Sequence, residues 1–422
     1  MKKSFSLFFL SLIFFILNSS GLKFAVISDI HLYDTTLGIT GKEFEDYIEN
    51  DRKLLKESSF LLDQFFEDIK NSDVNFILIP GDITKDGELV NHKLFLEKSS
   101  EILNKGIKIF VVPGNHDINN FDSYKYEDDK KIRVETVDRE NFLSLYKNYG
   151  FNNSYSKDEN SLSYIADLNG EYFLVALDGC KYFLNDVKNP STVSGRVNEK
   201  TLKWLEGNLK RLKNENKKFI VLIHHNLIEH FSGQKKGYPE YVLENNEKLL
   251  KILNRYDVKL IFSGHFHAND IVKKKMKNGY IFEIETGSPV TFPSPYRMVE
   301  ILNDTSVKIE TFSLLKSPVL YSYSKEYTEN GIYKIAYKII KSFNISDNES
   351  DILAKKISFS MVSHYQGDET LPEKFFDTKD FSLKSKFIMF LKRDMFKNLL
   401  VDTTPDNNVL INLYSGGISK IK

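Results

Sequence analysis

Short apolar segments alternate with longer polar segments through the first two-thirds of the chain, and this alternation restricts the fold more than any other feature. The short segments are rich in β-branched and aromatic residues and lack strict alternation, as do strands that helices cover on both faces. They are residues 24–27, 76–79, 109–112, 172–177, 219–223 and 260–262. The segments between them, such as 52–70 and 91–105, carry apolar residues at helical spacing. The pattern predicts a layered α/β domain, completed by further strands over residues 281–314.

After residue 316 the apolar residues recur with a helical period instead. Two such series are Ile332, Ile335, Ile339 and Ile340, then Phe387, Phe390, Leu391, Met395 and Leu399. We therefore expect residues 22–316 to form the α/β domain and residues 317–422 to form a smaller, mainly helical C-terminal domain. The single histidine of that region, His364, is expected to be a structural or surface residue.

The first residues have the three parts of a secretory signal. Lys2 and Lys3 precede an apolar run at residues 5–17, and Asn18 to Gly21 follow it. The run is shorter than the roughly 20 residues that a membrane span needs. We expect residues 1–21 to be a signal peptide, with a buried strand or an N-terminal membrane anchor as the alternatives. The mature chain is then exported, whether secreted, periplasmic or at the cell surface, and meets a membrane only through this segment.

Charge and cysteine content exclude two classes of function. Lys and Arg total 58, as do Asp and Glu, so the formal net charge is zero, and no nucleic-acid partner is expected. Cys180 is the only cysteine, which rules out an intrachain disulfide framework and a cysteine-based zinc site.

Five of the predicted strands are followed directly by histidine, carboxylate or both. The motifs are Ser28-Asp29-Ile30-His31, Pro80-Gly81-Asp82, Gly114-Asn115-His116-Asp117, His224-His225 and Gly264-His265-Phe266-His267. Each motif alone is weak, since a Gly-Asp pair is commonly a simple turn. Ligand sites of α/β sheets lie outside the carboxyl ends of strands, so five such motifs on successive strand ends predict one shared site.

The residue types indicate metal chemistry. Asp, Asn and His without thiolate supply the oxygen and nitrogen ligands that suit Mn²⁺, Fe or Zn²⁺. There are more of them than one tetrahedral ion uses, and a carboxylate with two oxygens can bridge two ions. Two cations about 3.5–4 Å apart form the clamp used in phosphoryl displacement. The sequence therefore predicts two divalent metal ions.

The five motifs resemble those of the calcineurin-like metallophosphoesterase superfamily, over about residues 23–290. The segment from Gly81 to Glu88 resembles a bacterial branch described as cyclic-nucleotide phosphodiesterase-like, some members of which also carry a helical C-terminal domain. The resemblance implies a four-layer α/β/β/α sandwich with a dinuclear metal centre.

The resemblance also implies a role for each motif residue. One ion would be held by Asp29, His31 and His267, and the other by Asn115, His224 and His265, with Asp82 bridging the two. His116 would protonate the leaving oxygen or stabilise charge, oriented by Asp117. The fourth motif commonly reads His-His-Pro, whereas here Asn226 follows His225. The family's ligand is the first histidine, so the assignment of His224 is unaffected.

Several other polar residues have no assigned role. His225 either touches substrate or packs locally, and Asp178 is expected to be structural. Asp86, Arg297 and Tyr238 lie either at the pocket rim or in solvated loops and local salt bridges.

We expect a metal-dependent phosphoester hydrolase, either a phosphodiesterase or a phosphatase, that uses a metal-bridging hydroxide. The alternative is a noncatalytic metal- or phosphate-binding protein on the same scaffold, in which the bridging carboxylate or His116 would be lost. Neither is lost here. The substrate is a small phosphoester: a cyclic nucleotide, a nucleotide, or a phosphodiester from lipid or cell wall. Because every motif ends by His267, a chain stopping near Leu315 is expected to keep turnover on a small aryl phosphodiester.

Overall fold

The computed structural model describes residues 21–401 and 404–421. The predicted signal peptide, apart from Gly21, lies outside the described residues. Among the helices of the described part, none is long and apolar enough to cross a membrane.

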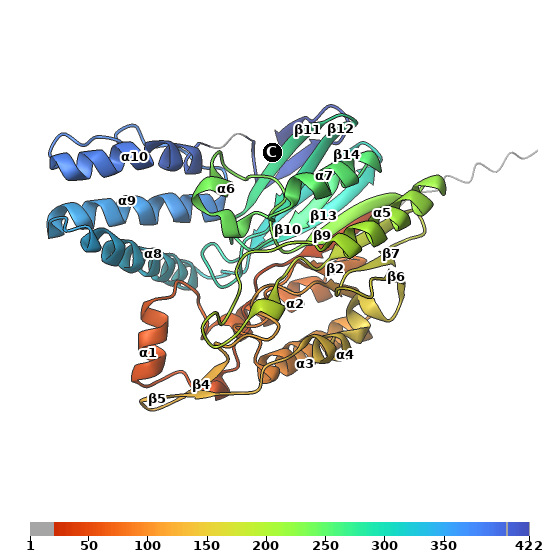
Figure 1. The fold of residues 1–422 in the computed structure, drawn as a ribbon, viewed down its shortest axis with the longest axis horizontal. Coiled ribbons are helices and arrows are strands. Elements are labelled where there is room, and N and C mark those ends of the chain that lie inside the picture. The colour runs from red at the N-terminus through yellow and green to blue at the C-terminus, as the bar shows by residue number, and fades with distance from the viewer. Residues whose placement is uncertain (1–20, 402–403, 422) are drawn as a thin grey trace, which may run out of the picture.

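Two seven-stranded mixed sheets form the body of the molecule (Figure 1). The first sheet has the order β16 (Ile418–Lys420), β15 (Val409–Asn412), β14 (Ser306–Ser313), β13 (Pro295–Asn303), β1 (Leu22–Val26), β2 (Phe76–Ile79) and β3 (Lys108–Val111). The second has the order β11 (Asp270–Met276), β12 (Gly279–Glu285), β10 (Leu260–Ser263), β9 (Lys218–Ile223), β8 (Tyr172–Leu177), β7 (Tyr164–Asp167) and β6 (Ser154–Lys157). All six strands predicted over residues 24–262 are present, with ends within two residues of those expected.

Parallel pairing brings the carboxyl ends of the central strands to one edge of each sheet. β1, β2 and β3 run parallel in the first sheet, and β8, β9, β10 and β12 run parallel in the second. The flanking strands pair antiparallel. The polar motifs that follow the central strands therefore meet at a common edge.

The core between the two sheets is packed with aromatic side chains. Phe24 of β1 stacks on Phe76 of β2 with ring centroids 4.8 Å apart, and it meets the edge of Phe262 on β10 at 5.3 Å. All three are buried. Burial of each such side chain contributes roughly 1.5–3 kcal/mol, which explains why these strands lack polar alternation.

Helices cover the outer face of each sheet, as the amphipathic segments predicted. α2 (Ser58–Lys70) and α3 (Leu89–Asn104) pack on the first sheet, and α5 (Glu199–Asn214) and α7 (Asn246–Arg255) pack on the second. The four-layer α/β/β/α sandwich is confirmed. One boundary differs from the prediction: the segment 52–70 becomes helical only at Ser58, because residues 52–57 turn toward the core, where the Leu54 amide donates to the Val290 carbonyl at 2.7 Å.

The loops between these strands and helices contain several shorter elements. They are α1 (Lys42–Glu49), α4 (Arg139–Leu145), α6 (Gln234–Gly237) and the hairpin of β4 (Tyr124–Glu127) and β5 (Lys130–Arg133).

A helical region follows β14, as predicted, and begins where Ser317 caps the helix ahead of Pro318. Figure 1 shows its three helices stacked at one side of the molecule. They are α8 (Pro318–Ser342), α9 (Asp347–Gln366) and α10 (Leu383–Leu399). The sequence did not reveal that the chain then returns: β15 pairs with β14, with Ser306 opposite Asn412. The helices are thus inserted between two neighbouring strands of the first sheet.

Candidate metal centre

The seven residues predicted as metal ligands converge at the carboxyl edge of the two sheets, and all are buried. They follow β1 (Asp29, His31), β2 (Asp82), β3 (Asn115), β9 (His224) and β10 (His265, His267).

One group of side chains lies on the β1 side of this edge. Ligand atoms of Asp29, His31, Asp82 and His267 all lie within 4.8 Å of one another. The Nε2 atoms of His31 and His267 are 3.1 Å apart, and Asp29 Oδ1 lies 3.5 Å from His267 Nε2. Ring nitrogens and a carboxylate oxygen aimed at one point form a donor set for a single cation.

A second group lies beside the first and shares one residue with it. Atoms of Asp82, His224 and His265 also lie within 4.8 Å of one another. Asn115 joins them, because its Oδ1 is 3.1 Å from His224 Nε2. His224 Nδ1 contacts the Pro80 carbonyl at 2.8 Å, which fixes the tautomer that leaves Nε2 available to an ion. Asp82 is the only residue common to both groups, as a bridging ligand would be.

The electrostatics of the two groups fit divalent cations. Burial raises the pKa of Asp29 to about 7. Burial disfavours the charged form of His224, yet Asp82 and Asp29 raise its pKa to about 9. Two carboxylates buried this deeply require positive charge nearby. Asp82 and His224 would hold a metal ion, which would supply that charge in place of the imidazole proton.

Most of the candidate ligands sit in strained backbone. Asp29, His31, Asp82, His265 and His267 have φ values between 43° and 78°. Non-glycine residues in this left-handed region cost about 1–3 kcal/mol each and persist only where the surrounding structure enforces them. Such strain is typical of functional sites.

Two of the motif turns contain a glycine because a neighbouring motif lies too close for any side chain there. A Cβ on Gly114 would lie 2.0 Å from Asp82 Oδ1, and one on Gly264 would lie 2.0 Å from Ser28 Oγ. The same packing holds Asp29, which accepts hydrogen bonds from Ser28 Oγ at 2.6 Å and from the His265 amide at 3.0 Å. The first and fifth motifs are therefore tied together directly.

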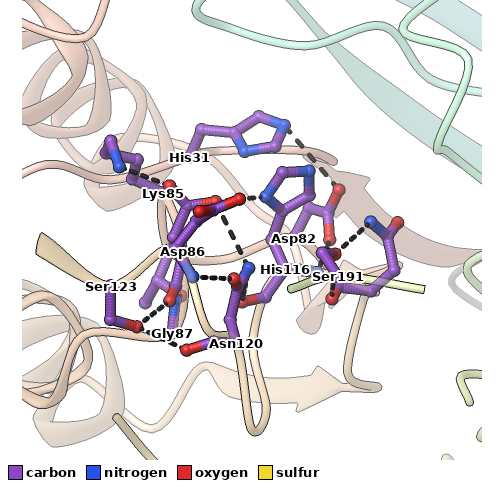
Figure 2. Close-up of polar contacts among 12 residues, drawn as sticks. His31, Asp82, Lys85, Asp86, Gly87, His116, Asn120, Ser123 and Ser191 are labelled. Carbon is purple, nitrogen blue, oxygen red and sulfur yellow. Dashed lines mark hydrogen bonds and ion pairs between the residues drawn. The ribbon is translucent and has the colours of Figure 1, made fainter. Parts of the chain in front are cut away.

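His116 lies at the entrance to the two groups. Its side chain is 24% exposed, and its ring meets the edge of His31 with centroids 4.9 Å apart. Nδ1 lies 2.8 Å from Asp86 Oδ1, as Figure 2 shows. Nε2 is therefore the atom available to a substrate.

The comparisons with known proteins agree with this geometry. A family model described as "Calcineurin-like phosphoesterase" matches residues 22–269. The chain belongs to this family. Among two solved structures that it matches, the first resembles it in fold. A dimetal phosphatase from Danio rerio is 15% identical, with 70% of this chain and 97% of that chain covered and a TM-score of 0.50. A purple acid phosphatase from yellow lupin (Lupinus luteus) seeds is 11% identical, with 71% and 52% covered and a TM-score of 0.44. A search of curated proteins found no match.

In this calcineurin-like phosphoesterase the carboxylate that contacts His116 is not the predicted one. Asp117 accepts hydrogen bonds from the amides of Gly114 at 2.8 Å and Thr84 at 2.9 Å, so it fastens the third motif to the second. Asp86, 30 residues before His116, occupies the orienting position instead. Adjacency in sequence was misleading because the turn directs the Asp117 side chain back over its own backbone.

Asp86 is itself held in place by buried partners (Figure 2). Lys85 forms an ion pair with Asp86 Oδ2 and lies 3.5 Å from Glu88, while Asn120 donates to Asp86 Oδ1 at 3.3 Å. Burial opposes ionisation of Asp86, yet Lys85 and then His116 hold its pKa well below the ordinary value. The carboxylate is therefore charged and fixed against His116, and of the alternatives considered for Asp86 the local salt bridge is the one found.

The remaining predicted polar residues are structural. His225 is buried, with Nε2 2.8 Å from the Val193 carbonyl. Asp178 accepts from Tyr182 at 2.9 Å and from backbone amides, as predicted for a structural residue. Arg297 is fully buried and donates to the Glu285 carbonyl at 2.8 Å, which neither alternative for it anticipated.

The two other residues considered earlier lie beside the C-terminal helices. Tyr238 is half-buried and packs on Phe266, with ring centroids 5.5 Å apart. His364 is buried and pairs with Glu369, as expected of a structural residue.

Sequence reasoning missed two cations and one carboxylate. Lys53 is only 7% exposed, and its ion-pair partner Asp51 is 3.7 Å away. Burial and then the charges of Arg52 and Lys53 lower the pKa of His267, so both cations act on the centre. Glu285 accepts from the Phe266 amide at 3.0 Å and holds the fifth motif. The sequence did not single out Arg52 and Lys53, because residues 52–57 have the apolar spacing of α2 but are not helical. Glu285 could have been found as a charge ending a buried apolar strand.

Proposed function

We propose that this chain hydrolyses phosphoester bonds with two divalent cations, each of them Mn²⁺, Fe or Zn²⁺. The observation that supports this most directly is Asp82, which is shared by two groups of buried nitrogen and oxygen donors. When bound, the two ions would activate water at neutral pH and neutralise charge on the phosphate oxygens. Asp29, His31 and His267 would hold one, and Asn115, His224 and His265 the other.

The side chains at the entrance supply the rest of the chemistry. His116 Nε2 is placed to donate a proton to the leaving oxygen, while Asp86 fixes the ring through Nδ1. Lys53 has only a distant ion-pair partner and would pair with a phosphate oxygen. Retention of Asp82 and His116 favours this reading over a noncatalytic metal- or phosphate-binding protein.

We infer that a diester is the preferred substrate class, since the segment from Gly81 to Glu88 resembles the cyclic-nucleotide phosphodiesterase-like branch. The N-terminal sequence supports an exported enzyme that meets extracellular phosphoesters, with no nucleic acid among its partners. Export argues against intracellular signalling nucleotides as the natural substrate.

A hydrolysis panel tests this function. Bis(p-nitrophenyl) phosphate, p-nitrophenyl phosphate and cyclic AMP are offered with Mn²⁺, Fe²⁺ or Zn²⁺, with Asp82→Ala and chelator-treated protein as controls. We expect metal-dependent turnover that both controls abolish. Protein that binds two metal ions per chain yet turns over none of the three substrates would support the noncatalytic alternative.

A further inference from the structure

A cavity of about 440 Å³ lies between the fifth motif and the C-terminal helices. Its walls include the aromatic side chains of Tyr238, Tyr241 and Phe266 and the aliphatic side chains of Ile335, Ile339 and Met361 from α8 and α9.

The inner end of the cavity adjoins the metal centre. Phe266 lies between the candidate ligands His265 and His267, and the ring of Tyr241 is 4.6 Å from that of His265. Arg52 lies over the ring of Tyr365 at 5.7 Å and also lines the cavity. Phe266 and Tyr241 therefore separate the cavity from the centre, and a chain attached to a phosphate at the centre would reach the cavity alongside them.

The chemistry of the walls selects the group that fits. The polar side chains of the wall are those of Tyr238, Tyr241, Tyr365, Arg52 and Lys392. The remaining side chains, mostly those of Ile, Ala and Met, offer no hydrogen bonds to a ligand. A flexible aliphatic chain needs none, and burial of its methylene groups is favourable. The two cations at the cavity, Arg52 and Lys392, match the anionic end of such a molecule.

The helices around the cavity also carry exposed apolar side chains. Ile339 lines the cavity and is 55% exposed. On α10 the exposed side chains of Leu383, Phe387, Phe390 and Leu391 follow one another at helical spacing, with exposures of 59% or more. The same helix carries five Lys and Arg residues and one Asp. An exposed apolar stripe beside basic residues is typical of helices that lie in the surface of a lipid layer.

We propose that the substrate is a phosphoester bearing a long alkyl chain, taken from a lipid surface against which α10 docks, with the chain held in this cavity. The inference rests on the proposed function for the identity of the reacting group, but chain binding is measurable without turnover.

Chain length is the first test. Methyl, butyl and octyl p-nitrophenyl phosphates carry the same leaving group and differ only in the alkyl arm. We expect kcat/KM to rise at least about 30-fold from methyl to octyl, because each buried methylene adds favourable transfer free energy. Equal values of kcat/KM for the three esters, or faster turnover of cyclic AMP than of the octyl ester, would overturn the chain site.

A pair of variants on α9 locates the site. Met361→Trp fills the cavity and should bring the octyl-to-methyl ratio of kcat/KM toward one. Phe359→Trp is the matched control, since Phe359 is exposed on another face of the same helix and should leave the ratio unchanged. Calorimetry with octylphosphonate, which cannot be hydrolysed, reports chain binding independently. Binding that is lost only in Met361→Trp supports the cavity even if no ester is turned over, in which case the proposed function alone fails.

Vesicle sedimentation tests the lipid source. The wild-type protein should sediment with phosphatidylglycerol vesicles, and the double variant Phe387→Ser/Phe390→Ser should bind at least about tenfold more weakly. Val319→Ser is the control, since Val319 is 80% exposed on α8 outside the patch. If the wild-type protein stays in solution, or if the double variant sediments like the wild type, docking through α10 is wrong.

Discussion

The imidazole of His116 contacts Asp86, while its neighbour Asp117 is occupied by backbone amides. Substitutions of Asp86 and of Asp117 should therefore have different effects on the enzyme. Asp86→Asn keeps the size of the side chain but removes the charge that holds the imidazole, so we expect kcat to fall about 10- to 100-fold with metal content unchanged. Elemental analysis beside steady-state kinetics checks this. Asp117→Asn should instead lower the Tm, and a kcat loss as large as that of Asp86→Asn would return the orienting role to Asp117.

His116→Ala separates acid catalysis from metal binding. Turnover should fall by about 10²–10⁴, the usual contribution of a general acid, with near-normal metal content. The loss should be smaller for p-nitrophenolate, which needs little protonation, than for an alkoxide leaving group. A variant that loses its metals, or a defect that ignores leaving-group pKa, would contradict the acid role.

A second cluster of buried charges contacts the fifth motif through Glu285, which accepts from the Phe266 amide. His230 Nδ1 lies 3.5 Å from Asp270 and 3.6 Å from Glu285, and its Nε2 lies 3.9 Å from Glu283. Burial opposes the charged imidazole, yet Glu285 and Asp270 raise the pKa of His230 well above its ordinary value of 6.5. His364 also acts on Asp270 and Glu285.

Loss of His230 should cost stability in a pH-dependent way. His230→Gln leaves carboxylates buried without their counter-charge, a change that costs roughly 3–5 kcal/mol. Because the folded pKa is raised, the contribution of His230 is fully present below pH 6.5 and declines as pH rises toward the folded pKa. The Tm difference between wild type and variant should therefore shrink from pH 6 to pH 9. A difference that grows with pH would show that His230 is neutral in the folded protein.

At the scale of elements, the strands and their ends follow from the sequence, because apolar runs and polar motifs are local signals. Helical spacing also predicted α10, but it did not show which side faces outward. Phe387, Phe390 and Leu391 share the helical spacing of buried Leu399, yet all three are exposed. Periodicity reports that one face differs from another and says nothing about what covers that face.

The return of β15 and β16 could not be read from the sequence, since both strands are short and β15 pairs with β14, which lies far away in the chain. Leu410 is opposite Lys308, so the pairing closes across the whole helical region. The candidate ligands, in contrast, could be predicted because each motif directly follows its strand in the sequence. The partners of those motifs, Asp86 and Lys53, come from turns, where sequence spacing does not report distance.

This pairing changes the expectation for a shortened chain. A chain ending at Leu315 loses two strands of the first sheet and leaves β14 as an unpaired edge. It also removes Asp406, whose carbonyl accepts from the buried Arg297 at 2.6 Å. We now expect this truncation to aggregate or to melt at least about 10 °C lower, as thermal unfolding would show. A soluble truncation with the wild-type Tm would restore the expectation that residues after 316 are dispensable.

At the scale of the whole molecule, the candidate metal centre joins the two sheets. Asp29, His31, Asp82 and Asn115 follow strands of the first sheet, and His224, His265 and His267 follow strands of the second. Bound ions should therefore stabilise the sandwich as a unit. At a free metal concentration 100 times Kd, each site adds about 2.7 kcal/mol to the free energy of unfolding.

Chelation should consequently lower the Tm, and Mn²⁺ should restore it. Asp82→Ala should bind fewer than two ions and show a much smaller metal-dependent rise in Tm, because Asp82 serves both groups. Asp178→Asn is a suitable control, since Asp178 is buried but belongs to neither group. A wild-type stoichiometry of one ion per chain would contradict the dinuclear centre.

The helices α8 to α10 enter and leave the first sheet at almost the same place. Within β14, Thr311 donates through Oγ1 to the Asn407 carbonyl at 2.9 Å, and its amide donates to Asn408 Oδ1 at 3.1 Å. A short hairpin turn could join β14 directly to β15, so the helical region is an insertion that could be replaced without changing the order of the strands. A chain in which such a turn replaces α8 to α10 should therefore keep every strand that precedes a candidate metal ligand, while losing the aliphatic wall of the cavity.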